Sequence, residues 1–187
     1  MEEEITKAVK ALEAGKTILY PTDTVWGIGC DVGNEAAIEK VLQVKEAKEG
    51  KSLIVLVADM EQLRKYVSKI PDLAWELLEY AERPITIVYP GGKNVAPSIL
   101  GEDGSIAIRV VKNPFCVKLI QKAGFAITST SANISGFPAP QSFLEIDAVV
   151  KERVDHIVNW KQNEKGAVKP STIVKIGFNG EVKFLRR

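Results

Sequence analysis

A polar block that directly follows an apolar run is the first segment whose residues could do chemistry. Residues 17–20 (Thr-Ile-Leu-Tyr) are typical of a buried strand, which Pro21 stops. Residues 22–24 (Thr-Asp-Thr) come next, with Gly27 and Gly29 just beyond them. Ligands of open α/β sheets bind at the carboxyl ends of strands, and glycine lets the backbone approach a ligand closely. The alternative is a turn whose side chains only satisfy local hydrogen bonds.

Three lysines in residues 45–52 (Lys-Glu-Ala-Lys-Glu-Gly-Lys-Ser) form a second candidate. The final Gly-Lys-Ser imitates a P-loop, but Lys45 stands where that motif needs its first glycine, and a helix rather than a strand is predicted before it. We therefore reject a P-loop and keep Lys45, Lys48 and Lys51 as candidate cations for a polyphosphate. The alternative is a solvated helix end, where lysines interact favourably with the helix dipole.

The hydroxyl-rich segment 129–136 (Ser-Thr-Ser-Ala-Asn-Ile-Ser-Gly) and Arg109 complete the set of candidates. The segment is expected to be a loop after a strand, where its donors can bind phosphate or adenine; a capped turn is the alternative. Arg109 lies in the otherwise apolar run 106–111, where an unpaired charge is costly. A carboxylate partner would explain this arginine, either within the protein or on a ligand. An edge position facing water is the alternative.

Helices and strands alternate along the chain, which predicts an α/β sheet that positions these segments. Apolar spacing predicts helices around residues 5–12, 34–45, 60–67, 71–78, 114–120 and 142–154. Predicted strands cover residues 17–20, 53–57, 85–89, 105–111, 125–128, 155–158, 171–176 and 181–185. Asn179-Gly180 predicts a hairpin between the last two strands, so the sheet should be mixed. Residues 163–170 are expected to be an exposed loop.

Composition excludes several classes of site. A chain of 187 residues favours one domain, which we expect to span residues 1–187. With two cysteines and one histidine, a Cys/His zinc site is excluded, and a Ser-His-Asp mechanism would need His156, which lies far from the polar segments. The net charge of +1 means that any basic patch must be local. No disulfide framework, signal peptide or membrane-length apolar run is recognisable, so we expect a cytoplasmic protein without membrane contact.

Several ordered blocks of this sequence resemble the YrdC-like family, the threonylcarbamoyl-AMP synthases, in their short bacterial form. The most specific blocks are residues 21–27 (Pro-Thr-Asp-Thr-Val-Trp-Gly) and 131–136 (Ser-Ala-Asn-Ile-Ser-Gly). Residues 83–86, 108–110 and 171–174 support them, and the resemblance covers nearly the whole chain. It implies a twisted open mixed sheet with flanking helices and a basic concave face.

The resemblance also implies an activity, that of an L-threonylcarbamoyladenylate synthase. This nucleotidyltransferase would make threonylcarbamoyl-AMP and pyrophosphate from L-threonine, bicarbonate and ATP with Mg²⁺, for tRNA modification by downstream threonylcarbamoyl-transfer proteins. A carbamate formed from threonine and bicarbonate can attack the α-phosphate, so the protein needs only to position substrates and stabilise charge. The residues implied to bind threonine are Thr24, Arg109, Ser129 and Ser171. The residues implied to bind ATP are Lys45, Lys48, Lys51, Ser131, Asn133 and Arg186. Among these, Lys45 and Lys51 would be the catalytic cations, and no metal would be held by the protein itself.

Two positions depart from common patterns of the family. Ala47 stands where the family usually has the arginine of a Lys-x-Arg pair, and we expect Lys48 to supply the missing charge. Leu56 stands where members with a longer C-terminal extension often have histidine, and the absence of this histidine is similar to the short bacterial form. The alternative function is a non-catalytic paralogue that binds nucleotide, tRNA or double-stranded RNA. A third possible function is that of a scaffold protein, whose polar loops are only turns.

Overall fold

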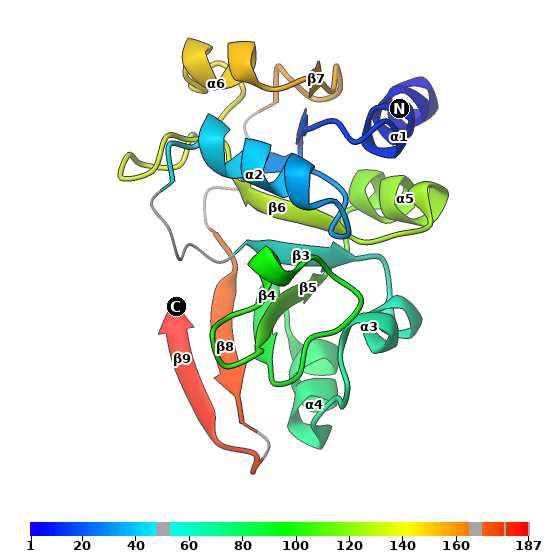
Figure 1. Cartoon of the computed structure of the whole chain (residues 1–187), viewed down its shortest axis with the longest axis vertical. Coiled ribbons are helices and arrows are strands. Elements are labelled where there is room, and N and C mark those ends of the chain that lie inside the picture. The colour runs from blue at the N-terminus through cyan, green and yellow to red at the C-terminus, as the bar shows by residue number, and fades with distance from the viewer. Residues whose placement is uncertain (48–52, 165–169, 178, 187) are drawn as a thin grey trace.

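One mixed sheet runs through the part of the chain that the computed structural model describes, residues 1–47, 53–164, 170–177 and 179–186. Nine described strands lie in the order β7-β1-β2-β6-β3-β5-β4-β8-β9 (Figure 1). The strands are β1 Ile18–Tyr20, β2 Gly27–Gly29, β3 Ile54–Val57, β4 Ile85–Tyr89, β5 Ile106–Val110, β6 Ile127–Ser131, β7 His156–Ile157, β8 Thr172–Ile176 and β9 Val182–Arg186. The helices are α1 Glu2–Glu13, α2 Glu35–Val44, α3 Met60–Tyr66, α4 Asp72–Tyr80, α5 Pro114–Ala123 and α6 Ala148–Arg153, with a short 3₁₀ helix η1 at Pro97–Ile99.

Parallel and antiparallel pairs occur side by side in this sheet. β3 pairs in parallel with β5 and antiparallel with β6. β8 pairs in parallel with β4 and antiparallel with β9, so the predicted hairpin at the C-terminal end is confirmed. Gly180 in its turn has a φ of 81°, in the left-handed region that glycine adopts without strain. The observed fold is thus the twisted, open, mixed α/β sheet that the sequence predicts.

Alternating side chains of the central strands belong to two hydrophobic clusters, one on each face of the sheet. In β3, Val55 and Val57 belong to a cluster that includes Ile38 of α2, whereas Leu56 belongs to the cluster beneath α1 and α5. Helices α1 and α5 pack against each other and cover one part of that face of the sheet (Figure 1). None of the described residues of β4, β8 or β9 joins the second cluster, so that end of the face is left uncovered by α1 and α5.

Two expectations about the polar segments were wrong in their boundaries. Gly27–Gly29 is a strand and not part of a loop, because it hydrogen-bonds to β1 on one side and to β6 on the other. The loop expected from residue 129 begins later, because β6 continues to Ser131 by pairing with β2 and β3. Gly29 permits this close pairing, since a Cβ there would lie 2.1 Å from the carbonyl oxygen of Thr128.

The helix expected over residues 142–154 is also wrong, since only α6 forms there. The Glu145 carboxylate accepts hydrogen bonds from the Gln141 backbone N–H at 2.9 Å and from the Ser142 hydroxyl at 3.3 Å, which holds this stretch in turns. Asp147 then caps α6 by accepting from the Val149 N–H at 2.9 Å. The other predicted helices are observed, and the expected loop 163–170 lies largely outside the described residues. Among the described helices, none has the length and apolar character needed to cross a bilayer.

Candidate functional site

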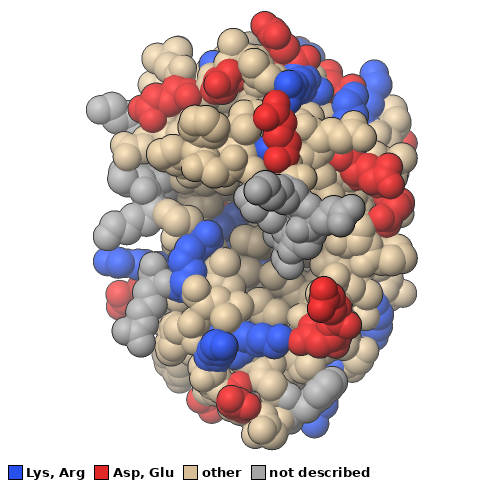
Figure 2. Space-filling view, turned by 60° about the vertical axis from the view of Figure 1, so that its left-hand side comes forward, with Lys and Arg blue, Asp and Glu red and all other residues tan. Residues whose placement is uncertain are grey.

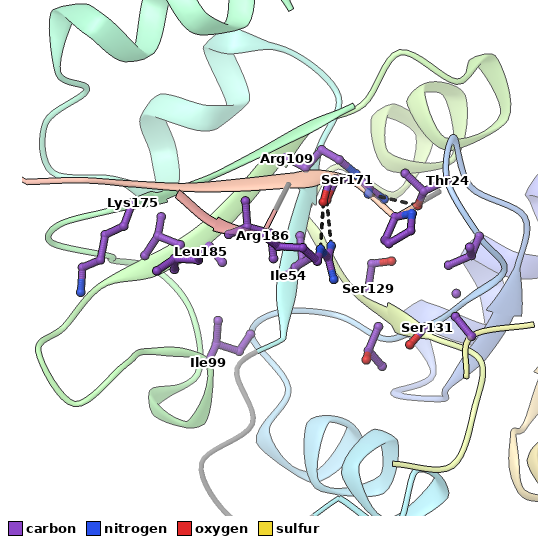
Figure 3. Close-up of a pocket in the computed structure, with 18 of the residues that line it drawn as sticks. Thr24, Ile54, Ile99, Arg109, Ser129, Ser131, Ser171, Lys175, Leu185 and Arg186 are labelled. Carbon is purple, nitrogen blue, oxygen red and sulfur yellow. Dashed lines mark hydrogen bonds between the residues drawn. The ribbon is translucent and has the colours of Figure 1, made fainter. Parts of the chain in front are cut away.

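A cavity of about 460 Å³, which we call the Arg109 cavity, lies on the part of the sheet face that α1 and α5 leave uncovered. Figure 2 shows a hollow in this side of the molecule with Lys and Arg side chains on its walls. Six of the predicted site residues line the cavity, and Figure 3 labels all of them: Thr24, Arg109, Ser129, Ser131, Ser171 and Arg186. Its described lining residues include three cations, with Lys175 as the third, and no carboxylate.

Strand register explains why residues far apart in the sequence meet here. Directly opposed residues of neighbouring strands share a face of the sheet. Ser129 of β6 is opposite Ile54 of β3, and Arg109 of β5 is opposite Leu56. Since residues two apart in a strand also share a face, one row of side chains runs across three strands into the cavity. The hairpin of β8 and β9 closes the far end with Arg186.

Arg109 is the centre of this row, and only 3% of it is exposed. One terminal nitrogen donates to the Thr24 hydroxyl at 3.2 Å, and the other lies 3.2 Å from a carboxylate oxygen of Asp23. The Nε–H is buried and has no hydrogen-bond partner among the described residues. The carboxylate expected for this arginine is therefore present within the protein, but the pair is not bidentate, and the guanidinium keeps a donor for a ligand.

The polar block after β1 combines a local turn with a cavity-lining residue. The Thr22 hydroxyl donates to the Val25 carbonyl at 2.7 Å and accepts from the Thr24 N–H at 3.0 Å, as the turn interpretation requires. The Thr24 hydroxyl lies 3.0 Å from the Thr22 hydroxyl and also accepts from Arg109 (Figure 3). Asp23 was predicted only as part of this block, and its role as the ion-pair partner of Arg109 was missed. Its position next to Thr24 was the available signal.

Ser171 links β4 to the C-terminal strand. Its hydroxyl shares a 2.8 Å hydrogen bond with the buried Thr86 hydroxyl. Arg186 donates from Nε to the Ser171 carbonyl at 3.0 Å and from a terminal nitrogen to the Ser171 hydroxyl at 3.3 Å (Figure 3). Burial, and after it the charge of Arg109, lower the pKa of the Arg186 guanidinium. An anion bound between Arg109 and Arg186 would offset the repulsion between the two charges and raise the pKa of Arg186.

Space beside Ser129 depends on a glycine. A Cβ on Gly27 would lie 3.0 Å from the Ser129 hydroxyl oxygen, which is tighter than side chains normally pack. Gly27 is also opposite Ser131 in the pairing of β2 with β6. A larger residue at position 27 would therefore crowd the two serines that line the cavity. Gly27 leaves room beside the two serines, and its role in the approach of a ligand stays a prediction, whereas Gly29 serves the approach of a neighbouring strand.

Lys45 and Asn133 lie beside the Arg109 cavity and are not among its lining residues. The Lys45 ammonium donates to the carbonyl oxygens of Ser131 and, at 2.8 Å, Asn133. The Asn133 amide donates to the carbonyl oxygens of Ile134 at 2.9 Å and Phe137 at 2.7 Å. In this structure both side chains brace the loop after β6. Lys48 and Lys51 lie outside the described residues.

Metal-binding side chains do not gather in this part of the protein. No group of three or more His, Cys, Asp or Glu residues in the described ranges could hold a metal ion. His156 sits on β7, away from the Arg109 cavity, and its Nε2 is buried without a described partner.

Comparison with known proteins identifies the family. The model of the Sua5/YciO/YrdC family, described as "Telomere recombination", matches residues 10–187. Threonylcarbamoyl-AMP synthase from Photobacterium profundum is 33% identical over 183 residues, 96% of this chain and 97% of that protein. The protein of the same name from Pseudoalteromonas translucida is 36% identical over 181 residues, 95% of each chain.

A solved structure agrees with these relatives. The crystal structure of P. abyssi Sua5 complexed with L-threonine matches with a TM-score of 0.84 and 27% identity, over 100% of this chain and 54% of that chain. This chain therefore spans about half the length of that Sua5 protein, whereas it matches the two synthases almost end to end. The resemblance inferred from the sequence blocks is confirmed, and the chain belongs to the Sua5/YciO/YrdC family.

Proposed function

We propose that this protein is an L-threonylcarbamoyladenylate synthase, a nucleotidyltransferase that uses ATP and L-threonine. The observation that carries the proposal is the Arg109 cavity, in which a buried guanidinium keeps an unused Nε–H beside three hydroxyl side chains. Such a site suits a hydroxy amino acid, because the carboxylate can accept from Arg109 and the polar groups can bond to Thr24, Ser129 and Ser171. Two relatives that match nearly the whole chain are named threonylcarbamoyl-AMP synthase, which supports the same activity.

The reaction requires positioning more than a protein nucleophile. The threonine amine and bicarbonate combine to a carbamate with loss of water, and a carbamate oxygen then attacks the α-phosphate of ATP. The bond from the α-phosphorus to the bridging oxygen breaks, and pyrophosphate leaves. Arg109 would fix the threonine end, while Arg186 and Ser131 would hold the nucleotide across the cavity. Holding both reactants in line can supply about 7–11 kcal/mol of the barrier reduction.

Charge on the leaving pyrophosphate is the second requirement. We assign this task to Lys45, Lys48 and Lys51, with Lys45 and Lys51 as the catalytic cations and Asn133 as a further nucleotide contact. Mg²⁺ enters as part of the substrate MgATP and shares the phosphate charge. For Lys45 this role requires the ammonium to exchange a carbonyl contact for a phosphate oxygen. Cations placed at the developing charge stabilise the transition state more than the ground state.

The wider setting of the proposal follows from the same activity. The product would serve threonylcarbamoyladenosine formation in tRNA, through downstream transfer proteins, in the cytoplasm. Bicarbonate is the third substrate. We propose that residues 1–187 act as one catalytic domain, since the full-length match to the two synthases leaves little of either relative uncovered.

Pyrophosphate release that depends on threonine tests the proposal. Purified protein is incubated with MgATP and bicarbonate, with or without L-threonine, and threonylcarbamoyl-AMP is measured by mass spectrometry. We expect one adenylate for each pyrophosphate, and no release without threonine. ATP binding without turnover would favour the nucleotide- or RNA-binding paralogue. If there is no turnover and ATP does not raise the melting temperature of the protein, the scaffold alternative holds.

A further inference from the structure

A second cavity, of about 510 Å³, lies beneath α4, and we call it the α4 cavity. Consecutive residues of β5 separate it from the Arg109 cavity, since Arg109 lines one and Val110 lines the other. Successive side chains of a strand point to opposite faces, so the two cavities lie on opposite faces of the sheet. Asp23 lines the α4 cavity and pairs with Arg109 at 3.2 Å. One ion pair therefore joins the two cavities.

The walls of the α4 cavity are mainly apolar. They are formed by side chains from two helices and two strands, namely Met60, Trp75, Leu78, Ile85 and Val110. Ala74 is the only fully buried residue of α4, and Trp75 and Leu78, which line the cavity, are partly buried. The volume is within the ~300–1,000 Å³ range of small-molecule sites, which combine apolar walls with a few polar groups.

A carboxylate with an unfilled hydrogen-bond position gives this cavity a place for a cation, with Arg109 balancing the charge of that carboxylate from the other face of the sheet. Three carboxylates line it, those of Asp23, Glu79 and Glu82, against the two cations Arg83 and Lys112. The Lys112 ammonium already donates to a backbone carbonyl of the loop after α4, at 3.0 Å. The Oδ1 atom of Asp23 is buried and, although it lies near Arg109, it accepts no well-aligned hydrogen bond. A donor that reached Asp23 from the α4 cavity would meet an acceptor with spare capacity.

We propose that the α4 cavity is a second ligand site, specific for a small amine with an aromatic or aliphatic body. The body packs against Trp75 and Leu78, and the ammonium lies by Asp23. The site is independent of the proposed synthase activity. Its effect on threonine, however, rests on that proposal: a threonine carboxylate draws Arg109 away from Asp23, which frees Asp23 for the amine. By linkage, the amine and threonine each strengthen the binding of the other.

Protein NMR with a matched pair of probes tests the site. Phenethylamine is titrated into ¹⁵N-labelled protein without substrates, beside 2-phenylethanol, which has the same body without the charge. We expect saturable shifts of the Trp75 indole signal and of the amides of residues 78–83, 85 and 110–113, with the millimolar affinity of a probe this small. The alcohol should bind about tenfold more weakly, because it lacks a hydrogen bond between charged groups.

Two variants locate the binding. Ala81→Trp fills the cavity from its rim and should abolish the shifts from both probes. Asp23→Asn should weaken phenethylamine about tenfold and leave 2-phenylethanol unchanged, which also shows that the variant is folded. Equal affinity for the two probes, shifts that survive Ala81→Trp, or shifts confined to residues of the Arg109 cavity would each overturn the proposal.

The link to threonine is measured separately. In saturating threonine, the dissociation constant of phenethylamine should fall about fivefold or more, the usual scale of coupling between sites. If calorimetry shows that threonine binds but the amine affinity does not change, the shared-carboxylate link is wrong. If threonine does not bind at all while the amine does, the proposed function fails and the amine site stands.

Discussion

Substitution of Arg109 by lysine separates a ligand role for this residue from a purely structural one. Arginine uses one terminal nitrogen for Thr24 and the other for Asp23, and it retains the Nε–H. Lysine keeps the positive charge, so the pairing with Asp23 can persist. Its single ammonium cannot also reproduce the planar fork that binds a carboxylate. The change should therefore remove substrate contacts while leaving the buried charge balanced.

The expected loss follows from one hydrogen bond between charged groups. Such a bond contributes about 1.5–3 kcal/mol. With ~1.4 kcal/mol for each factor of ten, the dissociation constant for threonine should rise roughly 10- to 150-fold. ATP affinity should change much less, since Arg186, on the hairpin, is assigned to the nucleotide. We expect a larger KM for threonine and a smaller change in kcat.

Isothermal titration calorimetry with threonine, and separately with MgATP, measures both effects. Arg153→Lys is the matched control, because Arg153 forms an exposed ion pair with Glu46 outside the cavity and the same substitution there should change neither affinity. A melting curve establishes that each variant is folded. Unchanged threonine affinity in folded Arg109→Lys protein would refute the carboxylate assignment, and equal losses for threonine and ATP would mean that Arg109 organises the whole cavity.

Three further variants test other parts of the structure. His156→Gln should retain turnover within roughly threefold in the pyrophosphate assay, because no proton-transfer role worth ~100-fold or more is removed; a larger loss in folded protein would contradict this. Ala47→Arg should raise kcat or lower KM for ATP, and a native protein that turns over only after this change would be a degenerate binder. Gly29→Ala should destabilise the protein by about 3 kcal/mol or more in urea unfolding, since its Cβ would overlap the Thr128 carbonyl. Gly33→Ala is the control, because the nearest atom to its Cβ would be 3.5 Å away.

Local sequence signals were sufficient where an element depends on its own residues. Strand β4 was predicted with its observed ends, and Asn34, at the start of the predicted helix 34–45, caps α2 by accepting from the Ala37 N–H at 3.0 Å. Strand β2 escaped prediction because Gly-Ile-Gly has little strand propensity, and its neighbours come from before and after it in the chain. Non-local pairing is not visible in local composition.

The candidate site was likewise predicted where local residues give a signal and missed where the site depends on non-local contacts. Sequence blocks indicated Arg109 and Thr24, which indeed meet in one cavity. Asp23 was not chosen as the partner carboxylate, because its position next to Thr24 does not by itself show that its side chain reaches Arg109. Lys45 and Asn133 were assigned to ATP from the lysine run, the hydroxyl-rich segment and the resemblance, and that assignment stays a prediction. The α4 cavity had no sequence signal, since it arises from how loosely one amphipathic helix packs.

The position of Arg186 on β9 has a consequence for the local stability of the cavity. Among the described strands, β9 lies at an edge of the sheet and pairs only with β8, and all five of its residues are exposed. Edge elements with little buried surface open at a lower free energy than the core. Arg109, by contrast, lies between β3 and β4 in the interior of the sheet. Amide exchange should therefore be fast along the Arg186 wall and slow around Arg109, so that the cavity can lose one wall without global unfolding.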